Sequence, residues 1–335
     1  MNSIISKVIT IWVQIRDLYL YLFRDAIILN GYVDDHTWHG IRHRNWGDDL
    51  NYYFLQQLTG CPVVFRHNFR IIGWFRHHSY LCIGTLLDGD KYKDSHTIIW
   101  GSGCSGANRG LQTPQKVLAV RGPKSREYLQ SQGIYCPEVY GDPALLLPLV
   151  YNPRDRFKVQ SSKFKASPSA SPCREEILFE TRNSKLETKR YRLGIIPHVV
   201  DLHHPVIKEI REKNTEEILI IDLAHYEKWT DVIDQICSCE RILSSSLHGL
   251  IVSDAYQVPS CWIELSGIIS GGYFKFFDYA SSVERDINEP ARIVKAADIA
   301  TLTDHADLHF SCADLEKVQE LQHCLIKVAP FKLKI

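Results

Sequence analysis

Apolar residues recur with two different periods along the chain, one typical of strands and one typical of helices. Between residues 31 and 158, strand-like runs such as HTIIW and KVLAV alternate with the helix-like LNYYFLQQL and SREYLQSQ. A second series, which includes RLGIIPHVV and EEILIIDLA, occupies residues 186–335. Strands and helices in alternation favour a parallel sheet covered on both faces. The pattern therefore predicts an α/β fold, and the second series looks Rossmann-like.

The segment between the two series has a different composition. Residues 159–185 include VQSSKFKASPSASPCREE, which is rich in Ser, Lys and Pro and shows no periodicity. A chain of 335 residues also exceeds the size at which one hydrophobic core keeps growing. We therefore expect two domains, over residues 31–158 and 186–335, joined by a linker or exposed excursion.

Residues 1–30 are predominantly apolar and form a predicted amphipathic helix. Charged residues such as Lys7, Arg16 and Arg24 interrupt the segment before it is long enough to span a membrane. No small-residue cleavage site of a secretory signal follows. Polar residues recur at near-helical spacing and leave a wide apolar face, which either packs on the protein or lies in a membrane interface. We favour packing, because buried helices are far commoner than interfacial ones.

Composition and charge narrow the classes of function. An apolar content of 45% and a charged content of 23% are typical of a globular protein. Because 39 basic residues balance 39 acidic ones, the whole chain has no excess charge for a nucleic acid or an anionic membrane, and any anion site is local. The ten cysteines are scattered, mostly within apolar runs. This usage indicates free thiols in a reducing cytosol, so we expect a cytoplasmic protein.

The motif GSGCSG follows the strand-like HTIIW. It matches the dinucleotide fingerprint, but Gly110 and Pro114 break the helix that the fingerprint requires after it. The backbone N–H groups of Gly101, Ser102 and Gly103 can instead approach an anion closely. An ordinary turn is an equally good interpretation.

The segment RGPKSREYL leaves the strand-like KVLAV and opens a helix, with Pro123 where a first helical turn tolerates it. Arg121 and Lys124 lie near the N-terminus of this helix, where cations and unpaired N–H groups suit a phosphate or a carboxylate. Basic residues are slightly unfavourable at this end of a helix, which favours a binding role over an ordinary solvated helix start. Arg121 is the first candidate.

Two adjacent carboxylates, Asp48 and Asp49, lie in NWGDDLN beside the helix-like LNYYFLQQL. An aspartate in this place commonly caps the helix, and we favour that interpretation. Alternatively, the turn at Gly47 faces a cleft, and one carboxylate binds sugar hydroxyls or acts as a general base.

The segment SSSLHGLIVSDAY follows the strand-like RILSS and opens another helix. The hydroxyls of Ser244, Ser245 and Ser246, with the unpaired N–H groups of the turn through Leu247, suit a phosphate. His248 on that turn can be charged and can donate a proton. The alternative is structural, with Ser246 capping the helix and His248 packing in the core.

A histidine-rich segment, HVVDLHH, contains His198, Asp201, His203 and His204. Its spacing differs from the HExxH pattern, and the neighbouring pair of histidines cannot easily share one ion on a strand. We therefore expect no metal site.

Seven motifs, taken in order, resemble the polysaccharide pyruvyl transferase family, especially its bacterial exopolysaccharide branch. They are NWGDDLN, GSG, VRGPKS, YGDPALLLP, RLGIIPHVVD, SSSLHGLIVSDAYQVP and KFFDY, between about residues 40 and 280. The resemblance implies two Rossmann-like domains that face a cleft, similar to the GT-B arrangement of glycosyltransferases. It also implies phosphoenolpyruvate as the donor substrate, with no organic cofactor.

The implied reaction joins the pyruvyl group to two hydroxyls of a hexose in a glycan or lipid-linked oligosaccharide, as a ketal, and releases phosphate. The donor carries a carboxylate and a phosphate, so its site needs arginines and helix N-termini, and we predict that Arg121 and the turn at 244–248 bind it. We expect His248 to be the general acid or the phosphate partner. His198 or Asp201 then assists the acceptor hydroxyl. A lipid-linked acceptor would suit peripheral contact of residues 3–24 with the inner face of the membrane.

One departure from the family pattern concerns the donor site. Many relatives have Arg-Leu-His where this chain reads SLH from Ser246, so one cation is missing. Arg121, Lys124 and Lys275, the last in the segment FKFFDY, are the candidates to replace it. Otherwise the donor or the activity differs. The alternatives are a GT-B glycosyltransferase that uses a nucleotide sugar and a non-catalytic glycan-binding protein.

Overall fold

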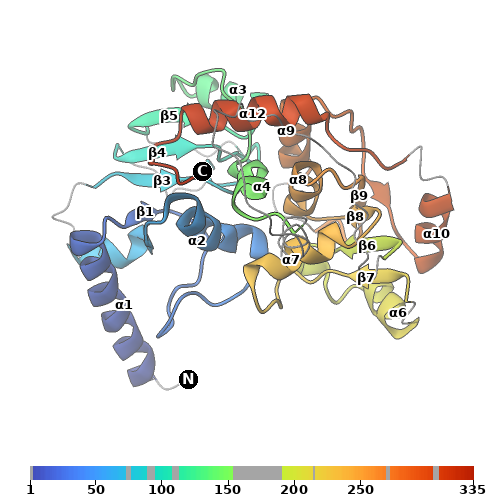
Figure 1. Cartoon of the computed structure of the whole chain (residues 1–335), viewed down its shortest axis with the longest axis horizontal. Helices are drawn as coiled ribbons and strands as arrows, with labels where there is room; N and C mark the ends of the chain where they lie inside the picture. The colour runs from blue at the N-terminus through green and yellow to red at the C-terminus, as the bar shows by residue number, and fades with distance from the viewer. Residues whose placement is uncertain are drawn as a thin grey trace, which may run out of the picture.

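Two parallel β-sheets organise the part of the chain that the computed structural model describes, which is residues 3–72, 77–88, 95–107, 113–153, 191–213, 216–268, 272–304 and 309–335. The first sheet contains β1 (Ile27–Leu29), β2 (Val63–Phe65), β3 (Ser79–Leu81), β4 (Thr97–Trp100) and β5 (Lys116–Ala119). The second contains β6 (Leu193–Ile196), β7 (Ile218–Ile220), β8 (Ile242–Ser244), β9 (Ser260–Glu264) and β10 (Ala291–Arg292). Figure 1 shows the first sheet on the left and the second on the right.

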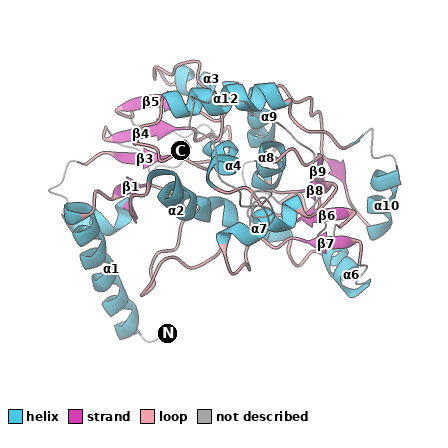
Figure 2. Ribbon diagram, in the orientation of Figure 1, coloured by secondary structure: helices cyan, strands magenta, loops and turns pink. Residues whose placement is uncertain are grey.

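The strands form where apolar residues run continuously, as in IIL, VVF and LGII, which are buried throughout. Such runs are typical of parallel strands that are covered on both faces. Helices lie on the faces of the sheets in Figure 2. The predicted α/β class is therefore confirmed, whereas the GT-B-like arrangement and the domain limits stay predictions. The predicted linker at 159–185 lies outside the described residues.

The helices that flank the sheets are α2 (Trp46–Thr59), α3 (Pro123–Ser131), α4 (Leu147–Val150), α6 (Pro205–Lys213), α7 (Trp229–Cys237), α8 (Leu247–Ala255), α9 (Phe274–Ser282), α10 (Ala296–Asp304) and α12 (Leu315–Lys327). Short 3₁₀ helices η1 (Arg66–Ile72), η3 (Pro143–Leu146) and η4 (Val199–Asp201) lie between them.

Both sheets are wound in the same order. From one edge to the other, the strands of the first sheet follow the order β2-β1-β3-β4-β5. Those of the second follow the equivalent order β7-β6-β8-β9-β10. Each order therefore reverses once, between β1 and β3 and between β6 and β8. In open α/β sheets, ligands bind beyond the carboxyl ends of the strands at such a reversal. The fold thus marks two places for a binding site before any side chain is considered.

The C-terminal segment returns to the first sheet. Within α12, Gln322 donates to the carbonyl of Leu145 (2.7 Å), and the indole of Trp100 on β4 donates to the carbonyl of Leu325 (3.1 Å). The ring of Phe331 then packs edge-on against Trp100, with 5.8 Å between the ring centroids. Figure 1 shows α12 crossing from β5 toward α9, so the last helix connects the two halves of the molecule.

The predicted N-terminal helix is α1 (Ser3–Phe23), which projects from the first half in Figure 1. Ile9 and Val13 are buried against the protein, so one face of the helix packs as expected. Another face, which includes Ile4, Ile11 and Ile15, stays exposed. Among the described residues, none of the helices combines the length and the apolar character that crossing a membrane requires.

Candidate active site

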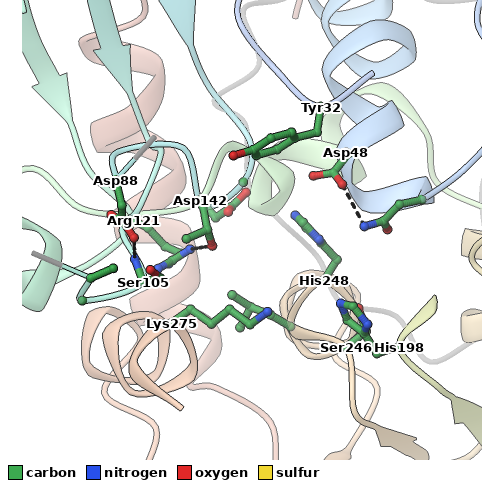
Figure 3. A pocket seen from close by; sticks show the side chains of 16 residues that line it. Tyr32, Asp48, Asp88, Ser105, Arg121, Asp142, His198, Ser246, His248 and Lys275 are labelled. Atoms are coloured by element: carbon green, nitrogen blue, oxygen red, sulfur yellow. Dashed lines mark hydrogen bonds between the residues drawn. The ribbon is translucent and has the colours of Figure 1, made fainter. Parts of the chain in front are cut away.

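A pocket of about 520 Å³ lies at the carboxyl ends of both sheets (Figure 3). Segments that follow β1, β3, β4 and β5 line one side, and segments that follow β6 and β8, together with α9, line the other. Its lining includes Tyr32, Asn45, Asp48, Thr85, Asp88, Ser105, Arg121, Asp142, His198, Ser246, Leu247, His248 and Lys275. The pocket therefore adjoins the reversal of strand order in each sheet, as expected for an open α/β sheet.

Arg121 follows β5 and is fully buried in the pocket wall. Its Nε pairs with Asp278 on α9 (3.0 Å), and its terminal nitrogens donate to the Thr85 hydroxyl (2.9 Å) and the Cys104 carbonyl (2.8 Å). These bonds take three of the five N–H donors that a guanidinium carries. Arg121 is therefore held rigidly, and it supplies positive charge to the pocket mainly through its fixed position.

Lys275, in the first turn of α9, also lines the pocket. The side chain is largely buried, and Figure 3 shows its amine pointing toward the start of α8. Burial lowers the pKa of Lys275 to about 8, with the Arg121 charge adding to the decrease and the Asp48 carboxylate opposing it. Lys275 is thus a cation at neutral pH in a pocket that Ser246 also lines.

His248 lies in the first turn of α8, and Figure 3 shows its ring pointing toward Asp48. Its Nε2 is buried without a hydrogen-bond partner among the described residues. Burial, with the Lys275 and Arg121 charges, lowers the pKa of His248 to about 3. The sequence suggested a charged histidine, whereas this pocket favours the neutral form at neutral pH.

Gly47, in the first turn of α2, explains how the histidine fits. A Cβ atom added to Gly47 would lie 2.0 Å from Nδ1 of His248. The first turns of α2 and α8 can therefore approach each other closely only because residue 47 has no side chain.

Asp201 does not line the pocket but is hydrogen-bonded, through Ser245, to a residue that does. Its carboxylate accepts hydrogen bonds from the hydroxyls of Ser266 and Ser245, the latter at 3.0 Å. The Ser245 hydroxyl in turn accepts the backbone N–H of His198 (2.8 Å). His198 does line the pocket, and burial together with the Lys275 charge lowers its pKa to about 4. The structure thus separates the two residues that the sequence proposed as equivalent helpers.

Of the two aspartates in NWGDDLN, only Asp48 reaches the pocket. The preferred capping interpretation is wrong for both. The cap is Asn45, whose side chain accepts the N–H of Gly47, and both aspartates lie within the first turn of α2. Asp49 instead accepts the Tyr226 hydroxyl (2.7 Å).

The Asp48 carboxylate accepts a hydrogen bond from Asn45 (2.8 Å). Burial, with the neighbouring Asp49 carboxylate, raises the pKa of Asp48 to about 7, against the effects of Lys275 and Asn45. A carboxylic acid near its midpoint at neutral pH can both donate and accept a proton.

Two further carboxylates line the pocket and were not among the residues predicted from the sequence. Asp142 caps η3, and its Oδ2 atom is buried and accepts no hydrogen bond among the described residues. Burial raises its pKa to about 6. Asp88, which follows β3, accepts the N–H of Ser105. Neither residue comes directly after a strand that the sequence predicts; for Asp142, the motif YGDPALLLP was the available signal.

Several predicted residues are structural in position. Ser102 donates to the carbonyl of Cys82 (2.6 Å), and Ser244 donates to that of Ser246 (2.8 Å). Gly103 packs against Arg121, whose Cζ would be 2.2 Å from an added Cβ.

The remaining predicted residues are placed as follows. Gly101, Lys124 and Ser245 do not line the pocket, whereas Ser246, Leu247 and the later part of the GSGCSG loop do.

Metal-ligand geometry occurs away from this pocket. Within the described residues, Asp35, His36 and His67 bring three ligand-type atoms within 4.8 Å of one another, whereas the segment HVVDLHH forms no such group. Asp35 is already bonded to His67 (2.8 Å) and to Asn68. Arg16 lies 4.0 Å from the same carboxylate. We therefore treat this group as a hydrogen-bond network that ties α1 to the loop after β1.

Together these features define an α/β protein whose pocket combines buried cations with protonatable carboxylates, a combination typical of an enzyme site. The particular family follows from comparison with known proteins. The chain belongs to the polysaccharide pyruvyl transferase family, whose model matches residues 45–267. This match confirms the resemblance and assigns pyruvyl transfer in polysaccharide chemistry as the general class of activity.

A relative from Acanthamoeba polyphaga mimivirus, an uncharacterized protein, is 25% identical over 254 residues, which are 73% of this chain and 74% of the relative. No solved structure matches the chain.

Proposed function

We propose that the chain transfers the pyruvyl group of phosphoenolpyruvate to two hydroxyls of a hexose, in a polysaccharide or its lipid-linked precursor. The product is a pyruvate ketal, and phosphate is released. The observation that carries the proposal is the division of the pocket, in which Lys275 and the first turn of α8 face the carboxylates of Asp48 and Asp142. A doubly anionic donor suits the first side, and sugar hydroxyls suit the second.

Donor binding is proposed to depend on Lys275. This chain has Ser246 in place of the family arginine, and Lys275 brings a buried cation to the same part of the pocket. The N–H groups at the start of α8 are unpaired within the helix and point toward an anion there. A neutral His248 adds a further hydrogen-bond partner for the donor, because its Nε2 has none among the described residues.

Proton transfer is proposed to start from Asp48. The protonated carboxyl gives its proton to the methylene carbon of the donor, which makes the adjacent carbon electrophilic. One sugar hydroxyl attacks that carbon and loses its proton to a base, for which Asp142 or His198 is placed. The bond between this carbon and the phosphate oxygen then breaks, and phosphate leaves. The second hydroxyl attacks the same carbon and loses its proton, which closes the ketal ring. General acid–base catalysis of this kind requires a group with a pKa near the working pH.

Phosphate release from phosphoenolpyruvate tests the proposal. Purified protein is offered a panel of hexosides, with Lys275→Met, His248→Ala and, as a control, Lys124→Met, which alters a basic residue outside the pocket. We expect release that requires an acceptor, falls by about 10²-fold or more in the first two variants and persists in the control. The apparent KM for the donor should rise as the pH increases through about 8, because Lys275 loses its charge there.

Other outcomes would contradict the proposal. Tight binding of a nucleoside diphosphate without release would indicate a glycosyltransferase. Binding of a free glycan without any turnover would indicate a binding protein.

A further inference from the structure

An apolar stripe along α1 faces solvent. Ile4, Val8, Ile11, Ile15 and Leu22 repeat at intervals of three, four or seven residues, and each has between 47% and 74% of its surface exposed. Residues spaced in this way lie on one face of a helix. A contiguous exposed apolar patch of this kind marks an interaction surface in a folded protein.

The opposite face of α1 is fixed to the protein. Ile9 and Val13 are buried, and Asp17 is fully buried in the helix as well. The Asp17 carboxylate accepts a hydrogen bond from Asn68 (2.8 Å), and the same amide also donates to Asp35. These buried polar contacts hold the helix in one rotation about its axis. The stripe therefore faces solvent, and α1 cannot rotate about its axis to pack the stripe onto the same molecule.

The width and the edges of the stripe indicate its partner. With 100° per residue, Ile11 and Ile5 mark edges that are roughly 120° apart, which is wider than the seam of a two-stranded coiled coil. Lys7 is exposed near one edge, whereas Arg16, near the other edge, pairs with Asp17 (2.8 Å), the one acidic residue in the sequence of α1. A broad apolar face with an exposed cation at its edge fits the surface of a membrane better than a second helix.

An aromatic side chain extends the same surface to the neighbouring loop. The indole N–H of Trp12 donates to the carbonyl of Trp38 (3.2 Å), and the two side chains are 42% and 46% exposed. Tryptophan is favoured at the boundary between lipid and water, because its ring is apolar and its N–H is polar.

We propose that α1 lies in the surface of a membrane that contains anionic lipids, with its apolar stripe among the acyl chains and Lys7 at the level of the headgroups. Trp12 and Trp38 mark the same depth. This proposal rests on the surface of α1 alone and holds whether or not the pocket transfers pyruvate.

Vesicle sedimentation tests the proposal with the full-length protein. The probes are phosphatidylcholine vesicles with and without phosphatidylglycerol, and the variant is the pair Ile11→Glu and Ile15→Glu. Val294→Glu and Ile268→Glu together serve as the matched control, because those apolar residues are 73% and 75% exposed elsewhere on the molecule. We expect binding to the anionic vesicles, weakened roughly tenfold or more in the α1 variant and unchanged in the control. Added salt should weaken the binding of the unaltered protein.

Two results would overturn the proposal. One is equal sedimentation of the unaltered protein and the α1 variant, with both shown to be folded by circular dichroism. The other is a dimer in light scattering that the α1 variant abolishes while vesicles bind neither protein, which would assign the stripe to a second copy of the chain.

Discussion

Charges in the pocket set one another's protonation. Burial lowers the pKa of both His248 and His198, and nearby positive charge adds to it, from Lys275 and Arg121 at His248 and from Lys275 at His198. Burial raises the pKa of Asp48, because the neutral form of a carboxyl group is the protonated one. At neutral pH the pocket therefore combines fixed cations, neutral histidines and a carboxyl group whose pKa is about 7.

Replacing Asp48 tests the role of this carboxyl group. Asp48→Asn should lower kcat by a factor on the order of 10² to 10⁴, because the amide cannot deliver a proton. In the unaltered protein, kcat should fall as the pH rises through about 7, where Asp48 loses its proton. A pH profile of kcat checks both points, and a variant with normal kcat would exclude Asp48 as the acid.

The same residue also links stability to pH. The pKa of Asp48 is raised in the folded protein, so the fold favours the protonated form, and this contribution to stability is lost as the pH increases through about 7. Asp48→Asn should therefore raise the Tm at pH 8 relative to the unaltered protein. Thermal unfolding at pH 5 and pH 8 measures the difference, which should be smaller at the lower pH.

At the scale of elements, the site depends on two helices that meet at their first turns. The starts of α2 and α8 come from different halves of the chain, and their contact is Gly47 against His248. This contact requires glycine because of space and not because of an unusual backbone angle. The position of the histidine is therefore determined by a residue 201 positions earlier in the sequence.

Gly47→Ala should displace the ring of His248 and lower kcat by about 10²-fold, since a shift of 1 Å in a catalytic group has effects of this size. Gly31→Ala is the matched control, because a Cβ there meets nothing closer than 3.9 Å. Steady-state kinetics of both variants, with circular dichroism to verify folding, provide the measurement. Equal loss of activity in the two variants would contradict the steric explanation.

Local patterns in the sequence predicted most elements and many pocket residues, because strand runs, turn residues and helix starts are local features. Arg121 and His248 were found in this way, whereas Lys275 was a candidate only through the family resemblance. The capping of α2 shows the limit. Asn45 and Asp48 are both suitable caps by residue type, and the structure uses Asn45 while Asp48 turns to the pocket.

Tertiary arrangement decided the rest. Asp88 and Asp142 are far apart in sequence and line one pocket because the segment after β3 and the segment after α3 reach the same edge of the first sheet. Strand order does not follow from periodicity, so this shared position could not be predicted from the sequence.

At the scale of the whole molecule, a buried ion pair joins segments from the two halves. Asp278 on α9 accepts Arg121 Nε and also the N–H (2.8 Å) and the hydroxyl (2.6 Å) of Ser125 on α3. Neither charged side chain is exposed. The pair therefore holds α9, with Lys275, against the first sheet.

Asp278→Ala should lower the free energy of unfolding by about 3–5 kcal/mol, because it leaves the Arg121 charge buried and unpaired. Glu209→Gln breaks the exposed pair with Lys213 and should change the free energy of unfolding by less than about 0.5 kcal/mol. Urea unfolding of both variants measures the two values. A loss below about 1 kcal/mol for Asp278→Ala would show that the pair contributes little to the joining of the halves.

The shared strand order of the two sheets has a consequence for how such a protein diversifies. Each half repeats one winding pattern, and each contributes its own set of connecting loops to a common cavity. Loops tolerate change better than the strands that carry them. Mutation can therefore reshape the loops that one half contributes to the pocket while the loops of the other half stay unchanged.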